Sequence, residues 1–350
     1  MKERILVAMS GGVDSSAAAV CLRNEGYSIA GATMVMFDSC EVPCASEDGA
    51  KDAEAACNRL GMDFHLIDAK APFKEYVMGS FVNSYLAGET PNPCIVCNNK
   101  LKFGLFLDYA LEKGFDKIAT GHYAKIKKQG ERYLLVRGED RNKDQSYVLY
   151  SLTQKALSHL VLPLGELSKA EVRELAADVG LSNADKKESQ DICFVPDGDY
   201  ASFIERRVGC VQHGEFALSD GTVIGEHKGI IRYTIGQHKK LGLGIHIPYY
   251  VLKKDAAANR IILGSNEDLF QKNVRAEEMN WIACDTPTHP IRVKAKLRYR
   301  HTEQDATVYA DEDGRATIVF DEAQRAITPG QAVVLYDGDV VVGGGKISNF

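Results

Sequence analysis

The chain has 350 residues, of which 45% are hydrophobic and 26% charged, with a formal net charge of −6 at pH 7. This length can supply the core of two or three domains, and the composition excludes a disordered chain. The negative charge excludes a general attraction to nucleic acid, so a polyanionic partner would need local basic surface.

The first third of the chain alternates predicted strands and helices. An apolar strand at 5–9 leads into Ser10-Gly11-Gly12-Val13-Asp14-Ser15-Ser16, and alanines then predict a helix. Further strands are predicted at 29–37, 63–67 and 117–120, and helices at 47–60, 72–86 and 101–112. Alternation of this kind predicts a doubly wound α/β fold with a parallel sheet. Ligands bind beyond the carboxyl ends of such strands, where SGGVDSS and the segment 120–123 fall.

The rest of the chain changes character twice. A capping box, Ser168 to Glu171, predicts a helix through 177. After 206 glycine becomes frequent and short strands are predicted at 216–218, 249–253 and 260–263, and from 275 the pattern is β, closing with a hairpin at 332–342. We predict a catalytic domain over 1–205, a small mixed domain over 206–272 and a β-barrel over 275–350.

The turn SGGVDSS has the features of a phosphate site. Unpaired N–H groups at a helix start attract anions, and Gly11 and Gly12 let the backbone come close. The hydroxyls of Ser10, Ser15 and Ser16 can donate to phosphate oxygens, and Asp14 can hold Mg²⁺. No GxxxxGK[ST] or GxGxxG pattern is present, which excludes a Walker loop and a dinucleotide fingerprint.

Nine cysteines, an odd number in a long chain, argue against a secreted disulfide framework. No apolar run approaches the roughly 20 residues of a membrane span and no signal peptide is recognisable, so we expect a cytoplasmic protein. Cys94 and Cys97 form a CxxC in a predicted loop before Lys100 and Lys102, a setting that lowers a thiol pKa. Cys193 lies in a second polar loop.

Three interpretations of these thiols stay open at this point. They could carry and release sulfur as a persulfide, which is thiol–disulfide exchange chemistry. Cys94, Cys97 and Cys193 could instead hold an iron–sulfur cluster, or a zinc ion with Cys40 or Cys44 as the fourth ligand. They could also be idle.

A basic segment, 292–300, alternates strictly between cations and other residues. If it is a strand, five cations project from one face. Such a face can be an edge protected by lysines, but five like charges repel one another, which favours an RNA partner.

Several motifs together resemble one family. SGGVDSS is similar to the pyrophosphate loop of the ATP pyrophosphatases. Combined with PNPCIVCNNKLKFG, ATGHYA, KDQSY, SQDICF and YTIGQHKKLG, the chain resembles the bacterial tRNA-specific 2-thiouridylases along its whole length. Other pyrophosphate-loop enzymes lack the CxxCN, KDQSY and SQDICF set. Ala8 replaces the family's usual glycine, and Cys94 stands where that family also uses aspartate.

The resemblance implies a role for particular residues. The residues that would bind ATP are Ala8, Met9, Ser10, Gly11, Gly12, Val13, Asp14, Ser15, Met34 and Gly121. Cys97 would be the nucleophile, and Cys193 would carry the persulfide and pair with Cys97 in a disulfide. The residues that would meet tRNA are His122, Lys143, Asp144, Gln145, Arg298, Tyr299 and Gln331.

The implied reaction is ATP-dependent 2-thiolation of the wobble uridine of tRNA, with ATP and Mg²⁺ and with sulfur from a cysteine desulfurase or a relay protein. Three alternatives remain: another adenylating pyrophosphate-loop enzyme, an iron–sulfur-dependent version of the thiolation with Cys94, Cys97 and Cys193 as cluster ligands, and an RNA-binding protein that holds a cluster or zinc without turnover. The sequence does not name the tRNAs, the donor or the oligomeric state.

Overall fold

The computed structural model describes residues 2–37, 47–178, 192–244 and 248–349, which fall into two compact units. The first unit comprises Met1–Met78, Cys94–Pro196 and Gly338–Val342. The second comprises Gly79–Pro93, Asp197–Asp337 and Gly343–Phe350. Within the described stretches, no helix has both the length and the apolar character needed to cross a membrane.

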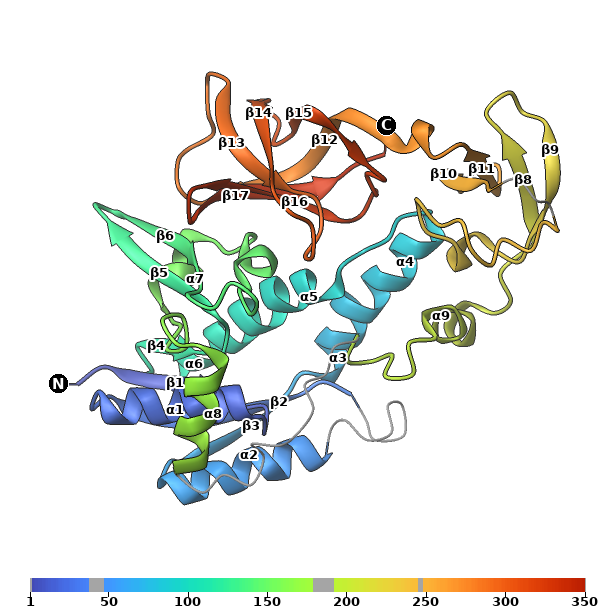
Figure 1. Cartoon of the computed structure of the whole chain (residues 1–350). Helices are drawn as coiled ribbons and strands as arrows, with labels where there is room; N and C mark the ends of the chain where they lie inside the picture. Colours follow the sequence, from blue (N-terminus) through green and yellow to red (C-terminus); the bar gives the residue numbers. More distant parts are fainter. Residues whose placement is uncertain (1, 38–46, 179–191, 245–247, 350) are drawn as a thin grey trace. The chain divides into compact units, whose positions relative to one another are not determined.

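A five-stranded parallel sheet forms the centre of the first unit (Figure 1). Its order is β3-β2-β1-β4-β7, with bounds Phe64–Asp68, Ser28–Val35, Arg4–Ala8, Lys117–Ala119 and Leu160–Val161. The strand β1 pairs with β2 on one side and with β4 on the other, so the winding direction reverses at β1. The loops after β1 and β4 therefore leave the same edge of the sheet at its switch point, where α/β folds bind ligands.

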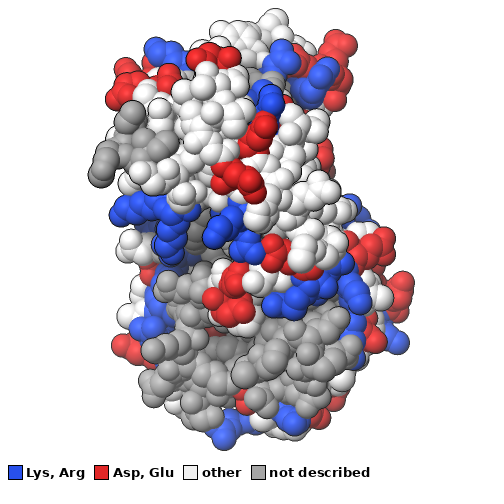
Figure 2. Space-filling view, turned by 90° about the vertical axis from the view of Figure 1, so that its right-hand side faces the viewer, with Lys and Arg blue, Asp and Glu red and all other residues white. Residues whose placement is uncertain are grey.

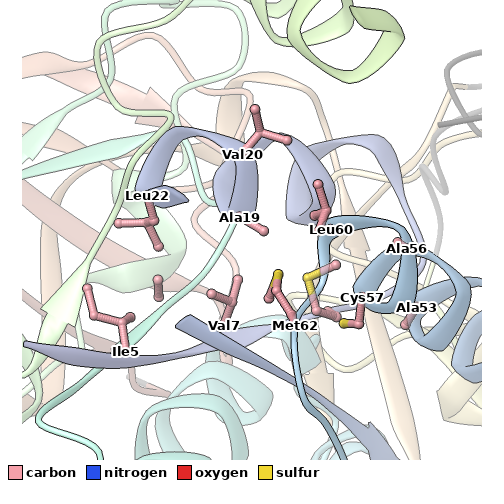
Figure 3. Close-up of a cluster of buried hydrophobic side chains, with 12 residues drawn as sticks. Ile5, Val7, Ala19, Val20, Leu22, Ala53, Ala56, Cys57, Leu60 and Met62 are labelled. Atoms are coloured by element: carbon pink, nitrogen blue, oxygen red, sulfur yellow. The ribbon is translucent and has the colours of Figure 1, made fainter. Parts of the chain in front are cut away.

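Two helices, α1 (Val13–Asn24) and α2 (Glu47–Leu60), pack against this sheet (Figure 3). The cluster that they bury includes Val7 from β1 and Cys57 from α2. A Cβ at Gly31 would lie 2.3 Å from the Cys57 sulfur, so glycine permits this close approach. On its other side α1 places Ala17 and Ala18 in a second buried cluster. Small side chains suit α1 because it is packed on two sides.

The CxxC lies in a helix, and the loop predicted for it is wrong. This helix runs through α5 (Pro93–Val96), the π-helical segment η2 (Cys97–Leu105) and α6 (Phe106–Glu112). Proline suits a first helical position because the N–H it lacks would have no partner there. A π-helical stretch is rare, and such stretches are frequent at functional sites.

The other elements of the first unit surround this framework. They are α3 (Lys70–Pro72), η1 (Phe73–Gly79), β5 (Ala124–Gln129), β6 (Arg132–Arg137), η3 (Ser146–Leu149), α7 (Gln154–Ser158) and α8 (Lys169–Asp178). The predicted capping box is confirmed at the start of α8. The Ser168 N–H donates to Glu171 Oε2 at 2.7 Å, and the Glu171 N–H donates to Ser168 Oγ at 3.3 Å.

The described residues of the second unit form two helices and two sheets. The helices are α4 (Ser80–Leu86) and α9 (Tyr200–Val208), and short 3₁₀ turns are η5 (Ile230–Arg232) and η6 (Glu267–Leu269). A small sheet has the order β10-β11-β8-β9, with bounds Tyr250–Asp255, Arg260–Gly264, Gly214–Leu218 and Val223–His227. It is the mixed sheet of the small central domain, since β11 pairs parallel with β8 and the other pairs are antiparallel.

Six strands close the C-terminal barrel of the second unit. Their order is β12-β15-β14-β13-β16-β17, with bounds Phe270–Trp281, Ala316–Arg325, Gln304–Ala310, Ile291–Lys296, Ala332–Asp337 and Val340–Ile347. The pairing of β12 with β17 closes the ring. The predicted fold class, a doubly wound domain followed by a small mixed domain and a β-barrel, is confirmed.

Candidate active site

The turn after β1 forms an anion cradle at the start of α1. Gly11 has φ +74°, and a Cβ there would lie 2.6 Å from the Gly49 oxygen, so a larger residue would not fit. Gly12 occupies the N-cap of α1 and has no side chain to pair with the first-turn amides. These N–H groups and the helix dipole therefore suit a phosphate.

The serine hydroxyls of the turn brace the loop. Ser15 Oγ and Ser16 Oγ donate to the Gly12 oxygen at 3.0 and 3.1 Å, and both side chains are buried. Ser10 Oγ lies 3.2 Å from Ser15 Oγ. The expected hydroxyl contacts to phosphate would have to compete with these bonds, so in this structure the backbone amides are the better donors.

The remaining predicted ATP-binding residues lie near the same edge of the sheet. Ala8 ends β1, and the N–H of the buried Met9 donates to the Ala32 oxygen at 2.8 Å. Met34, near the end of β2, is half-buried. A Cβ at Gly121 would lie 2.8 Å from the backbone carbon of Asp14, so the loops after β1 and β4 touch and glycine is required there.

Asp14 is held by two residues to which the sequence analysis assigned no role. Lys169 Nζ lies 2.7 and 2.9 Å from its two carboxylate oxygens, and Tyr123 Oη donates to Oδ1 at 2.7 Å. These partners occupy the oxygens that a metal would use, so Asp14 as arranged here does not fit the predicted Mg²⁺ ligand. One signal could have pointed to Lys169: a cation in the first turn of a helix is unfavourable against the dipole unless an anion meets it.

The three candidate thiols all belong to the first unit. Cys94 and Cys97 are three residues apart on one helix and therefore share a face. Cys193 lies in a different segment of the chain. The next residue, the buried Phe194, anchors that segment through an edge-to-face contact with Phe73, with 5.7 Å between the ring centroids. Each of the other two thiols acts electrostatically on Cys193. All three are free thiols in this structure, so the implied disulfide between Cys97 and Cys193 stays a prediction.

The expectation that the CxxC thiols are acidic is wrong. Partial burial raises the pKa of Cys94 and Cys97, and the nearby Lys102 cation offsets this only in part. Burial, with the two neighbouring thiols, raises the pKa of Cys193 to about 12. Cys94 and Cys193 keep exposed surface, but the protein around their sulfur atoms removes enough water to favour the neutral thiol.

Two asparagines fasten the thiol-bearing helix. Asn98 Nδ2 donates to the Val148 oxygen at 3.0 Å, and Asn99 Nδ2 donates to the Ser151 oxygen at 3.2 Å. Asn98 is buried, and its Oδ1 is a buried atom without a hydrogen-bond partner. A buried carbonyl oxygen of this kind is costly unless a further donor reaches it.

His122 follows Gly121, one of the predicted ATP-binding residues, and shares the influence of Lys102 with the thiols. It is buried, and its Nδ1 lies 2.8 Å from Thr120 Oγ1. Burial lowers the pKa of His122 well below its usual value, and the Lys102 cation adds to this effect, so the ring is neutral at pH 7. Lys102 therefore acts on both the imidazole and the three thiols.

A bound metal does not fit the thiols as they are arranged. Among residues 2–37, 47–178, 192–244 and 248–349, no group of three or more His, Cys, Asp or Glu side chains is placed to hold a metal ion. Cys40 and Cys44, the proposed fourth zinc ligands, lie outside the described residues.

The predicted RNA contacts Lys143, Asp144 and Gln145 lie in the first unit and are all half-buried. Asp144 accepts from the N–H groups of Gly138 and Ser146 at 3.0 and 3.1 Å. Gln145 exchanges two hydrogen bonds with the backbone of Tyr123, each of 2.9 Å. Two of the three predicted contacts thus also stabilise their own loop.

The basic segment of the second unit differs from its prediction. The strand β13 ends at Lys296, so Arg298, Tyr299 and Arg300 lie in the following turn, where all three are exposed. On the strand, Arg292 forms a bidentate pair with Asp321, at 2.7 and 2.8 Å, and Lys294 pairs with Asp305 at 3.2 Å. Carboxylates therefore neutralise cations that were predicted to repel one another.

The last predicted RNA contact, Gln331, lies in the second unit. Its Nε2 donates to the Thr90 oxygen at 2.7 Å and it is half-buried. Figure 2 shows groups of Lys and Arg interspersed with Asp and Glu on the face that it presents. This distribution agrees with a net negative chain that could hold a polyanion only through local groups.

Comparisons with known proteins cover the whole chain. A family described as the tRNA methyl transferase HUP domain matches residues 3–197, one described as the tRNA methyl transferase PRC-barrel domain matches 201–265, and the aminomethyltransferase beta-barrel domain matches 271–347. The tRNA-specific 2-thiouridylase MnmA of Clostridioides difficile is 44% identical over 99% of this chain and 98% of that protein. The protein of the same name from Halothermothrix orenii is 45% identical over 99% of each chain.

Solved structures show a weaker likeness. The U34-tRNA thiolase NcsA from Methanococcus maripaludis with its [4Fe-4S] cluster is 18% identical, with a TM-score of 0.35, covering 58% of this chain and 66% of that chain. A likeness at this level carries no argument about this protein. The identity over the full length and the matched domains show that the chain belongs to the tRNA-specific 2-thiouridylase family.

Proposed function

We propose that the protein catalyses ATP-dependent 2-thiolation of the wobble uridine of tRNA. Family membership supports tRNA thiolation as the overall activity. The mechanism is supported by the location of Cys97 and Cys193, distant in sequence, within the unit that also holds the nucleotide loop, and by the electrostatic effect of Cys97 on the pKa of Cys193. An adenylating enzyme that made an amide would have no use for two such thiols.

The nucleotide loop would activate the base. Uracil O2 is a poor leaving group, so O2 attacks the α-phosphate of ATP, the α–β phosphoanhydride bond breaks, and pyrophosphate departs. In this proposal the first-turn amides of α1, and the ammonium of Lys169 once it leaves Asp14, stabilise the charge that develops on the phosphates. Mg²⁺ with the ATP stays a prediction, without Asp14 as its ligand.

The thiols would then supply sulfur. A donor, a cysteine desulfurase or relay protein, leaves a persulfide on Cys193, and its outer sulfur attacks C2 of the adenylated base while AMP leaves. Cys97 attacks the inner sulfur of Cys193 and breaks the S–S bond, so the outer sulfur stays on the base. The resulting disulfide must be reduced by an external thiol before the next turnover.

RNA binding completes the proposal. His122, Lys143, Asp144 and Gln145 in the first unit, and Arg298, Tyr299 and Gln331 in the second, remain the predicted contacts. The wobble base must leave its stack to reach the nucleotide, at a cost of about a few kcal/mol. The predicted domains 1–205, 206–272 and 275–350 and the cytoplasmic location also stay predictions.

The test is mass spectrometry of nucleosides from tRNA incubated with the protein, ATP, a persulfide donor and a reductant. Wild-type protein should form 2-thiouridine and AMP. Cys97→Ser and Cys193→Ser should form no 2-thiouridine, whereas Cys210→Ser, which changes an exposed cysteine of the second unit, should behave as wild type. Absence of 2-thiouridine with wild-type protein, or undiminished activity of both site variants, would refute the proposal.

A further inference from the structure

The carboxylate of Asp14 is the centre of a network of three side chains, of which the proposed chemistry uses only the Lys169 ammonium. Its two oxygens meet the Lys169 ammonium, whose side chain is only 11% exposed, and the Tyr123 hydroxyl meets Oδ1. Lys169 Nζ also lies 5.7 Å from the centre of the Tyr123 ring, within the range of a cation–π interaction. Tyr123 itself is buried.

Both partners of Asp14 are also held by a single loop. The 138–145 loop connects β6 with η3. At one end of the loop, Asp140 Oδ2 accepts from the Lys169 N–H at 3.2 Å. At the other end, Gln145 Oε1 accepts from the Tyr123 N–H, and the Gln145 N–H donates to the Tyr123 oxygen. The loop therefore reaches Asp14 by two separate routes.

The 138–145 loop is braced internally, so a force on one part is transmitted to the rest. Asp144 Oδ1 binds the backbone at Gly138, and the Lys143 N–H donates to the Asp140 oxygen at 3.0 Å. A Cβ at Gly138 would lie 2.9 Å from the Tyr123 oxygen, so the loop and Tyr123 are in close contact. Asp14 in turn touches Gly121, next to the buried His122.

We propose that the 138–145 loop communicates RNA contact to the nucleotide loop through Tyr123 and Lys169, with Asp14 as the junction. This rests on the proposed function, in which Lys143, Asp144 and Gln145 meet tRNA. RNA that engages this loop competes for the Gln145 side chain and, by moving Lys143, displaces Asp140 from the Lys169 N–H. It thereby loosens Tyr123 and Lys169 from Asp14 and makes the Lys169 ammonium available to the triphosphate.

Asp14 and Tyr123 are then positioning residues, and the coupling is reciprocal. If tRNA raises the affinity for the nucleotide, the nucleotide raises the affinity for tRNA by the same factor. We expect a factor of about ten, within the usual range for coupled sites. A merely structural role for Tyr123 would alter stability and leave this factor unchanged.

The test uses the full-length protein, α,β-methylene ATP, which cannot be cleaved between the α and β phosphates, and unmodified tRNA. The dissociation constant of the nucleotide is measured by calorimetry with and without saturating tRNA. In Tyr123→Phe, which loses the hydroxyl and keeps the ring, tRNA should change this constant less than about twofold. Tyr109→Phe is the matched control, because its half-buried hydroxyl lies 3.0 Å from His65 Nδ1 in the same unit.

Asp140→Asn tests the second route, because it weakens the bond to the Lys169 N–H and leaves Tyr123 intact. It should lower the coupling factor to a value between those of wild type and Tyr123→Phe. Absence of coupling in wild-type protein, or full coupling in both variants, would overturn the inference. Since no turnover is involved, this result is independent of whether 2-thiouridine forms, which tests the proposed function alone.

Discussion

Two regions carry ionisable groups that the sequence predicted to be functional: the nucleotide loop and the thiols of the first unit, and the strand β13 of the second unit. The groups of the two regions differ in burial. In the first unit, the Lys169 side chain is 11% exposed, and burial controls the pKa of the thiols and of His122. Arg292 on β13 and its partner Asp321 on β15 are 58% and 52% exposed and face solvent as a pair.

The number of cations in a segment therefore does not predict where an anion binds. A single ammonium in a desolvated setting interacts strongly with a nearby anion, because little water screens it. Exposed cations with carboxylates beside them contribute little, since solvent and salt screen both partners. The residue that the sequence motifs overlooked, Lys169, is therefore expected to matter more than the basic strand that they emphasised.

The largest expected effect is that of Lys169→Met. This change removes the half-buried cation that pairs with Asp14 and should lower tRNA-dependent AMP formation about 100-fold, a magnitude typical of lost transition-state donors. Lys155→Met is the matched control, because Lys155 forms an exposed pair with Asp108 in the same unit. The initial rate of AMP release measures the effect of each variant. Equal rates for Lys169→Met and Lys155→Met would show that the exposure of the cation does not decide its importance.

A smaller effect is expected in the pH dependence of Cys193 alkylation. Burial favours the neutral thiol and raises its pKa to about 12, so the thiolate fraction should keep increasing from pH 7 to 10. Free cysteine, with a pKa of about 8.5, should level off near pH 9.5 and react about tenfold faster or more at pH 8. Peptide mass spectrometry after brief iodoacetamide treatment gives both rates, and a plateau for Cys193 by pH 9 would show that burial does not dominate.

The smallest effect is expected for Arg292→Ala on β13. Because Asp321 already neutralises this guanidinium, the slope of log affinity for tRNA against log salt concentration should stay as in wild type. Arg298→Ala, in the exposed turn after β13, is the comparison, and it should reduce the slope by about one if Arg298 meets a phosphate. Filter binding over a salt series measures these slopes, and a reduced slope for Arg292→Ala would restore β13 as an RNA contact.

Local patterns predicted much of the fold and part of the site. The glycines of SGGVDSS predicted the turn because the φ of Gly11 and its close contact with Gly49 are properties of one short segment. The capping box of Ser168 and Glu171 was predicted for the same reason. The helix that carries Cys94 was missed, since Pro91 and Pro93 resemble a turn until Pro93 is recognised as a first helical residue.

The sequence by itself determined the winding of the parallel sheet, the barrel, the nucleotide turn and the identity of the thiols, because each is encoded in neighbouring residues or in spacing along the chain. Only the tertiary structure decided that Asp14 meets Lys169, 155 residues away, that burial raises the thiol pKa values, and that Asp321 neutralises Arg292. Desolvation and charge pairing depend on which distant segments surround a group, and no local pattern specifies those neighbours.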